Sequence, residues 1–323
     1  MTTTRGRFAP SPTGPLHLGN ARTALLSWLS ARAQGGVYLM RVEDLDGPRV
    51  RPGLETAILE ELRWLGLDWD EGPDVGGPWA PYRQSERLPR YRDALDVLRR
   101  AGRAYPCFCS RAEIAAVSQA PHGPSDEGPR YPGTCRDLSA EEVARRSAAR
   151  RPAWRFRVPD GEVSFEDGVH GPRTHDVAAE TGDFVIMRAD GVPAYQLAVV
   201  VDDAAMEVSE VVRGDDLLPS TARQLLLYRA LGLPEPRFAH VPLVVGEDGT
   251  RLAKRHGALS LGELRARGAD PRRVAGLLAH ASGLTQDAGP VEPRALVEGF
   301  AVGRLPRGPA QLAKAEVEGL LEP

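Results

Sequence analysis

The chain has 323 residues, a length that predicts about two domains. It is 42% hydrophobic and 26% charged with a net charge of −3, which excludes a largely disordered chain and a polycation that coats nucleic acid. An RNA partner remains compatible with this charge, because a local basic face decides such binding. No apolar run approaches the roughly 18 residues of a membrane span, no secretory segment begins the chain, and three cysteines cannot all pair. We therefore expect a cytoplasmic protein without membrane contact.

The N-terminal third alternates between predicted strands and helices. A strand at about residues 6–9 is followed by a proline-rich turn and by an apolar-periodic helix that ends at a Gly-Gly pair. The next predicted strand, 37–42, brings Glu43 to its carboxyl end, and a second helix is expected at about 54–65. This alternation favours an α/β fold.

Regular α/β signals return after residue 181. Residues 183–188 and 196–201 are short apolar runs rich in β-branched side chains, which we interpret as strands covered on both faces. A helix at about 221–231 follows, with Ser220 as its expected N-cap, and residues 240–245 are a further predicted strand. Together these elements predict a Rossmann-like parallel sheet with right-handed crossovers.

The composition also predicts a division of the chain. We expect a catalytic domain in two halves, residues 1–72 and 182–245, separated by an insertion over residues 73–181 in which Pro and Gly are dense and all three cysteines lie. Residues 246–323 are expected to contain a charged loop followed by short helices.

Ligands of parallel sheets bind beyond the carboxyl ends of the strands. Polar residues follow three of the predicted strands: Arg7–Ser11, Glu43-Asp44 and Asp202-Asp203. We expect them to converge on one cleft.

Two segments have the chemistry of a nucleotide site. His17-Leu-Gly-Asn20 begins the first helix, where Gly19 permits a close ligand and the free N–H groups attract phosphate. Arg251 and Lys254 lie on a glycine-bounded loop and could neutralise charge on a transferred phosphoryl or adenylyl group. Taken singly, a capping histidine and a solvated basic turn are the ordinary alternatives.

The cysteines form a possible metal site. Cys107, Cys109 and Cys135 would supply three thiolates to Zn²⁺, which prefers four sulfur or nitrogen ligands. General chemistry suggests His122 or His170 as the fourth ligand, and three unrelated buried thiols are the alternative. We expect a structural role, because the insertion has few apolar residues to hold it together.

Several motifs together resemble one family. The run Arg7–Asn20 is similar to the "HIGH" segment of class I aminoacyl-tRNA synthetases in its glutamyl form, and Arg251–Arg255 to the "KMSKS" loop. Further glutamyl-type segments follow in the expected order: Arg41–Asp46, Tyr195–Asp203 and Val212–Asp215. The sequence departs from the family pattern at three places: Arg251 replaces a usual lysine, Ala253 a usual serine, and Gln196 a common asparagine.

The cysteines and the short chain after the second motif point to a particular group. A full glutamyl-tRNA synthetase has a large anticodon-binding region, for which the remaining residues are too few. The chain resembles instead the glutamyl-queuosine tRNA(Asp) synthetases, which attach glutamate to the queuosine base in the anticodon loop. This resemblance implies ATP with Mg²⁺, L-glutamate and queuosine-containing tRNA(Asp) as substrates, one structural Zn²⁺ with Tyr131 as its fourth ligand, and a monomer.

The resemblance also assigns site residues. It places glutamate among these positions: Arg7, Phe8, Ala9, Pro10, Ser11, Glu43, Tyr195 and Arg213. Two arginines can each fork a carboxylate while Glu43 pairs with the α-ammonium, although the sequence does not say which arginine takes which carboxylate. ATP is expected to contact His17, Gly19, Asn20, Arg251 and Lys254, with His17 and Lys254 as the catalytic pair. Lys254→Ala should slow glutamate-dependent pyrophosphate exchange by ~10²–10³ in kcat.

Three other functions fit parts of this pattern. A truncated enzyme that charges tRNA(Glu) shares the first half-reaction, so only the acceptor distinguishes it. A small-molecule nucleotidyltransferase would share the phosphate-binding helix but would not need Glu43, Tyr195 and Arg213. A non-catalytic tRNA-binding paralogue would tolerate the changes at Arg251 and Ala253.

Overall fold

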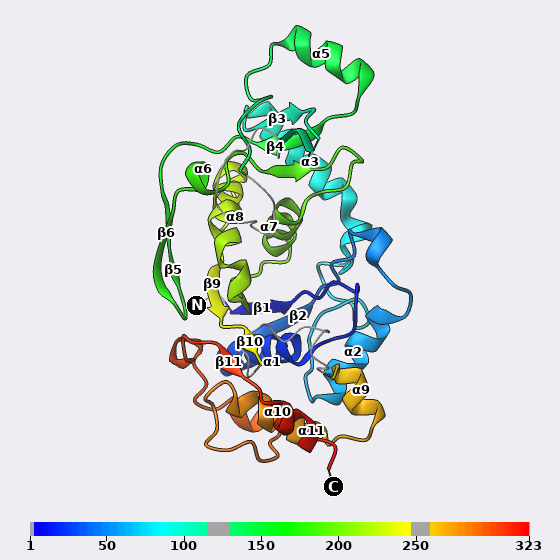
Figure 1. Cartoon of the computed structure of the whole chain (residues 1–323), viewed down its shortest axis with the longest axis vertical. Helices are drawn as coiled ribbons and strands as arrows, with labels where there is room; N and C mark the ends of the chain where they lie inside the picture. Colours follow the sequence, from blue (N-terminus) through cyan, green and yellow to red (C-terminus); the bar gives the residue numbers. More distant parts are fainter. Residues whose placement is uncertain (1–2, 111, 115–129, 247–258, 323) are drawn as a thin grey trace.

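The computed structural model describes residues 3–110, 112–114, 130–246 and 259–322. The molecule is elongated, with parallel strands near its middle (Figure 1). An antiparallel sheet and helix α5 (Ala140–Ala149) lie at one end of the long axis, and the C-terminal helices lie at the other. The predicted α/β class with a parallel sheet is confirmed.

The central strands form two adjoining groups. Strand β1 (Arg5–Phe8) pairs in parallel with β2 (Val37–Met40), as predicted. Strand β8 (Glu210–Gly214) pairs in parallel with β9 (Arg237–Val241). The backbone N–H of Ser209 donates to the carbonyl of Arg5 at 3.0 Å, so β1 and β8 lie side by side.

Two further strands extend this sheet from within the predicted insertion. Strand β5 (Val163–Asp167) pairs in parallel with β9 at Asp167 and Phe238. Strand β6 (Gly171–His175) pairs antiparallel with β5 at the edge. Residues before position 182 therefore contribute to the sheet that carries the cleft.

Helix α1 (Leu18–Ala33) packs against β1 and β8, and Trp28 is buried in the resulting core. Helix α2 (Leu54–Trp64) presents Ile58 and Leu62 to the same core. Both helices match the predicted ones. Helix α2 has an apolar face at the helical period, whereas α1 is buried on nearly all sides, and a glycine follows the end of each helix within two residues.

Residues 196–201 were predicted as a strand, and this prediction is wrong. They belong to helix α7 (Tyr195–Ala205), in which every residue from Gln196 to Asp203 is buried. A helix buried on all sides has no polar face, so its sequence cannot be told from a buried strand by periodicity alone. Asp202 and Asp203 consequently lie in a helix and do not follow a strand.

Two smaller predictions also need correction. Helix α8 (Leu218–Leu231) begins before Ser220, because a 3₁₀ turn at Asp215–Leu217 leads into it and Pro219 occupies its first turn. The predicted strand 240–245 is split into β9 and β10 (Val244–Val245), since Pro242 cannot donate a ladder hydrogen bond.

The antiparallel sheet contains β3 (Ala104–Cys107), β4 (Ala153–Phe156) and β7 (Val185–Met187) in that order. Helix α3 (Leu88–Arg100) leads into it, and the short α6 (Val177–Glu180) precedes β7. Strand β7 was predicted as a strand of the parallel sheet, whereas it pairs antiparallel with β4. Pairing thus crosses the expected boundary at residue 182, and the domain division stays a prediction.

The C-terminal region consists mainly of short helices, as predicted: α9 (Leu261–Ala266), α10 (Pro271–His280) and α11 (Lys314–Gly319). The short 3₁₀ turns Pro293–Leu296 and Val302–Arg304 separate them, and β11 (Ala310–Gln311) pairs with β10. Arg22 of α1 is buried against this region, donating to Ser282 Oγ at 2.8 Å and to the carbonyl of Pro242 at 2.6 Å. Among the described helices, none has the length and apolar character needed to cross a bilayer.

Candidate active site

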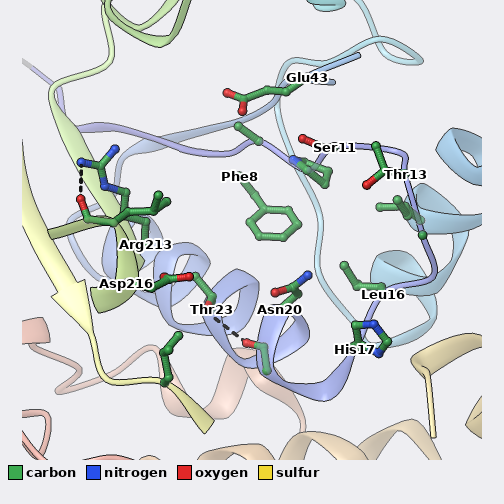
Figure 2. Close-up of a pocket in the computed structure, with 18 of the residues that line it drawn as sticks. Phe8, Ser11, Thr13, Leu16, His17, Asn20, Thr23, Glu43, Arg213 and Asp216 are labelled. Carbon is green, nitrogen blue, oxygen red and sulfur yellow. Dashed lines mark hydrogen bonds between the residues drawn. The ribbon is translucent and has the colours of Figure 1, made fainter. Parts of the chain in front are cut away.

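A pocket of about 650 Å³ opens at the carboxyl ends of β1 and β8 (Figure 2). Its lining includes every predicted glutamate- and ATP-site residue that lies in the described chain: Arg7, Phe8, Ala9, Pro10, Ser11, His17, Gly19, Asn20, Glu43, Tyr195 and Arg213. Arg251 and Lys254 lie outside the described residues. The three-dimensional structure therefore brings together side chains that are up to 206 positions apart in the chain, Arg7 and Arg213.

The nucleotide side of the pocket is formed by the start of α1. Three prolines between Phe8 and His17 keep the chain out of a helix until Leu18. His17 is the N-cap residue, so the first N–H groups of α1 face the pocket region without intrahelical acceptors. Ser260 forms a bridge with His17, which places the start of α9 beside this helix end.

On a second side of the pocket, charges are tightly paired. Arg41 is fully buried and donates to Asp203 at 2.5 Å and to Glu43 at 3.0 Å. Arg7 also pairs with Asp203, at 3.4 Å. Burial raises the pKa of Glu43, and the positive charge of Arg41 opposes that rise. Glu43 thus enters the pocket as a largely buried acid beside the cations Arg41 and Arg7, and its carboxylate is a suitable partner for an ammonium group.

Asp202 was expected in the cleft, and the structure corrects this. Its carboxylate accepts from Arg87 at 2.6 Å, from Gln84 at 2.9 Å and from Tyr91 at 2.7 Å. All four side chains are buried, and none of them lines the pocket. Asp202 therefore holds α3 to α7, while Asp203 supports the pocket only through Arg7 and Arg41.

Arg213 approaches the pocket from β8 and is 4% exposed. In Figure 2 Arg213 lies at the left of the pocket, Glu43 at the top and His17 at the lower right. Its Nη2 donates to Thr221 Oγ1 at 2.9 Å and to the carbonyl of Leu217 at 3.3 Å. Its Nη1 is buried and has no hydrogen-bond partner among the described residues. A buried guanidinium with an unused donor is suited to an anionic ligand.

Sequence reasoning missed several lining residues. Thr13, Thr23 and Asp216 line the pocket, and Thr23 donates to the carbonyl of Gly19 at 3.1 Å. Asp216 follows β8, whose strand was not predicted, although the motif ending at Asp215 adjoins it. Recognising β8 as a parallel strand would have identified Asp216.

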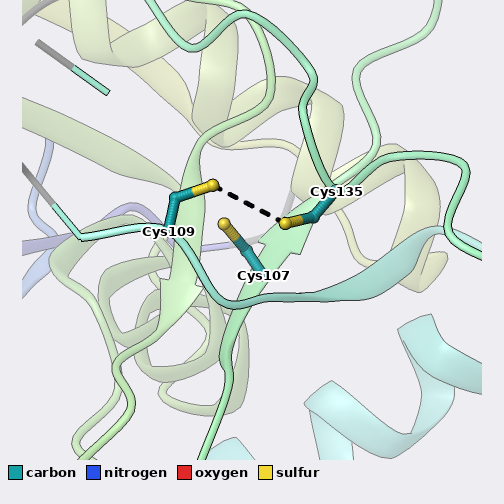
Figure 3. Close-up of side chains that lie close together, drawn as sticks. All are labelled: Cys107, Cys109 and Cys135. Carbon is teal, nitrogen blue, oxygen red and sulfur yellow. Dashed lines mark hydrogen bonds between the residues drawn. The ribbon is translucent and has the colours of Figure 1, made fainter. Parts of the chain in front are cut away.

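The three cysteines also come together, at the end of β3 (Figure 3). Their sulfur atoms all lie within 4.8 Å of one another, and Cys107 and Cys135 are buried. The hydroxyl of Tyr131 is 3.4 Å from Cys107 Sγ and 3.9 Å from Cys109 Sγ. Three sulfurs and one oxygen so arranged fit a four-coordinate ion such as Zn²⁺.

The other candidate fourth ligands do not join this cluster in the described chain. His170 Nε2 lies 3.8 Å from Asp215, beside the central sheet. His122 lies outside the described residues. Arg155 donates to Cys107 Sγ at 3.3 Å and stacks on the Tyr131 ring at 3.7 Å, so the cluster also has a cationic neighbour.

Comparisons with known proteins agree with this geometry. Residues 3–285 match the family of class I tRNA synthetases (E and Q), catalytic domain. A relative from Symbiobacterium thermophilum, named glutamyl-Q tRNA(Asp) synthetase, is 56% identical over 98% of both chains. Another of that name, from Nitratidesulfovibrio vulgaris, is 51% identical over 94% of both.

Longer proteins also match. Glutamate–tRNA ligase 2 of Acidithiobacillus ferrooxidans is 48% identical over 97% of this chain, which spans only 65% of that protein. A crystal structure of a glutamate tRNA ligase from Elizabethkingia meningosepticum in complex with its amino acid superposes with a TM-score of 0.87 at 31% identity. That match covers 99% of this chain and 69% of the other.

Proposed function

Because this chain belongs to the class I tRNA synthetases of the glutamyl and glutaminyl group, we propose that it activates L-glutamate with ATP and transfers it to queuosine in tRNA(Asp). The observation that carries the proposal is that Arg7, Arg213 and Glu43 line one pocket together with the N-terminus of α1. An amino acid with two carboxylates and one ammonium matches the charges of these three residues. The acceptor is suggested by the relatives that align along almost their whole length.

The first step needs positioning and charge stabilisation but no general base. The α-carboxylate of glutamate is already ionised and attacks the α-phosphorus of ATP, forming the mixed anhydride while pyrophosphate departs with Mg²⁺. His17 and the N–H groups at the start of α1 stabilise the phosphates. Lys254, outside the described residues, is proposed to neutralise charge in the transition state.

The second step moves the glutamyl group to RNA. A hydroxyl of the modified base attacks the carbonyl carbon of the adenylate, loses its proton, and AMP leaves. The base must reach the pocket, so we expect the nucleotide to leave its stack. Because phosphate contacts with arginines dominate such binding, tRNA affinity should fall steeply with salt.

The second candidate is attachment of glutamate to the 3′ end of tRNA(Glu), favoured by the 48% identity with a glutamate–tRNA ligase. The test incubates the protein with labelled glutamate, ATP and one of three RNAs: tRNA(Asp) with queuosine, tRNA(Asp) without it, and tRNA(Glu). We expect label only on the first, and nuclease digestion should recover it in the fragment that contains the anticodon loop and not on the 3′-terminal adenosine. Label on tRNA(Glu), lost after periodate, would support the ligase.

The cysteine cluster is proposed to hold one structural Zn²⁺ through Cys107, Cys109, Cys135 and Tyr131. Bound there, the ion would join β3 to the segment around Cys135, which are far from the pocket. Metal analysis should find one zinc per chain, and Co²⁺ in its place should give a thiolate-to-metal absorption band. Cys135→Ser should lose the metal, whereas Tyr131→Phe should weaken its binding; unchanged zinc content in Cys135→Ser would refute the site.

A further inference from the structure

The guanidinium of Arg213 is held by partners that carry no charge. Its Nε donates to Nε2 of His240 at 3.0 Å, and its Nη2 donates to Thr221 and to the Leu217 carbonyl. Within the part of the chain that the structure describes, none of these hydrogen-bond partners is a carboxylate. Arg213 therefore keeps its positive charge for the pocket, whereas Arg7 shares Asp203 with Arg41.

The contact with Arg213 fixes the tautomer of His240. An arginine Nε always bears hydrogen, so Nε2 of His240 must be the acceptor and its ring proton must lie on Nδ1. That proton points to Asp167, because Nδ1 lies 2.5 Å from Asp167 Oδ2. Burial lowers the pKa of His240 to about 4, the nearby Arg213 charge adds to this, and Asp167 opposes it. The imidazole is therefore neutral at pH 7.

Asp167 is itself rigidly held at the end of β5. Its Oδ1 accepts from the backbone N–H groups of Val169 and His170 at 3.0 and 2.9 Å. The carboxylate also accepts from the backbone N–H of His240 at 3.2 Å. Asp167 and His240 are 2% and 0% exposed, and neither lines the pocket.

From this chain of contacts we infer that Asp167 and His240 are positioning residues that orient Arg213 and thereby set the enzyme's affinity for the substrate carboxylate. Asp167 keeps the proton of His240 on Nδ1, and Nε2 then accepts from Arg213 Nε. The Nη1 group, which has no partner among the described residues, is left for the ligand. The inference rests on the proposed function, since glutamate supplies the carboxylate.

The first experiment needs no substrate. A long-range ¹H–¹⁵N spectrum of the whole protein at pH 7 should show His240 as the neutral Nδ1–H tautomer, assigned by its loss in His240→Gln. Asp167→Asn should disturb this tautomer, because an amide that keeps its oxygen on the backbone donors turns its N–H₂ toward Nδ1. The ring must then lose either its contact with residue 167 or its contact with Arg213, and its ¹⁵N shifts should change. An Nε2–H form or an imidazolium in the unaltered protein would overturn the inference.

The second experiment uses a matched pair at one position. His240→Gln keeps an acceptor near the place of Nε2, whereas His240→Asn reaches only Asp167 and leaves Arg213 Nε without a partner. We expect His240→Asn to raise the KM for glutamate in pyrophosphate exchange by about 10-fold, the loss of one hydrogen bond to a charged group. The KM for ATP should stay unchanged, and His240→Gln should lie closer to the unaltered enzyme.

These outcomes separate the inference from the proposed function. If the unaltered protein activates no glutamate, the proposed function fails, while the tautomer of His240 still decides whether the hydrogen-bond chain exists. Equal KM values for glutamate in His240→Asn and His240→Gln would overturn the positioning role. So would a His240→Asn variant in which the KM for ATP rises as much as the KM for glutamate. Thermal unfolding of each variant checks that a poor KM does not reflect an unfolded protein.

Discussion

The two arginines of the pocket are held in opposite ways. Arg7 lies in a network of buried ion pairs, where Arg41 joins Asp203 to Glu43. Arg213 lies among a neutral imidazole, a hydroxyl and a carbonyl. The first arrangement compensates its charges within the protein, so it serves stability as well as the site. The second leaves a cation without an ion-pair partner among the described residues, so its natural partner is a ligand.

The largest expected effect concerns the buried ion pairs of Arg41. Arg41→Gln should lower the free energy of unfolding by ~3–5 kcal/mol, because Asp203 and Glu43 would lose a shared buried cation. Urea denaturation measures this change. Arg213→Gln is the comparison, since it leaves no buried carboxylate without a partner among the described residues. Equal losses of unfolding free energy in the two variants would contradict the claim that Arg41 compensates buried carboxylates whereas Arg213 does not.

The next largest effect concerns Arg213 as a residue that binds glutamate. Arg213→Gln should raise the KM for glutamate by ~10–100-fold, because a hydrogen bond to a charged group would be lost. Arg213→Lys is the matched control, which keeps the charge but loses the planar fork and the contact with His240. Pyrophosphate exchange at varied glutamate concentration gives the KM of both variants. A KM that remained normal in Arg213→Gln would remove Arg213 from the glutamate site.

The pH dependence of stability tests whether His240, the neutral partner of Arg213, is buried without charge. Its folded pKa of about 4 lies below the ordinary 6.5, so the unfolded chain binds more protons between these values. Stability should therefore fall as pH drops from 6.5 toward 4, by up to ~1.4 kcal/mol per pH unit from this residue. His240→Gln should show a shallower dependence in urea denaturation over that window. Parallel curves would mean that His240 does not titrate as described.

The smallest effect concerns Thr221, which contacts both Arg213 and His240. Thr221→Val keeps the shape and removes the hydroxyl, and it should raise the KM for glutamate by ~5-fold, the value of one ordinary hydrogen bond. Thr221→Ser retains the hydroxyl and should behave like the unaltered enzyme. A larger effect of the serine variant would show that packing, and not the hydroxyl, is what matters there.

Local sequence signals predicted the parts of the site that are local. The segment from Arg7 to His17 contains the prolines and the glycine that form its turn, and it leads directly into helix α1. Its structure could therefore be predicted from local sequence alone. Glu43 follows a strand with a clear apolar pattern. The three cysteines are also close enough in sequence to suggest one cluster.

The rest depends on pairings between distant segments. Asp167 meets His240 only because β5 joins β9, and no short pattern predicts that β5 leaves the insertion to enter the central sheet. Helix α7 was mistaken for a strand because it is buried on all sides and also contains three successive valines, which favour strands. The roles assigned to the pocket residues stay predictions that only ligand binding and kinetics can test.

The position of β1 between β2 and β8 has a consequence during synthesis of the chain on the ribosome. Arg5 meets Ser209 across 204 positions, so one edge of β1 has no neighbour until the chain beyond residue 209 has been synthesised. At 5–20 residues per second that interval is roughly 10–40 s. During that time the backbone N–H and C=O groups on that edge of β1 are open to pairing with other nascent chains. Ribosome-bound fragments that stop short of β8 should therefore associate with chaperones, and full-length chains should be released from them.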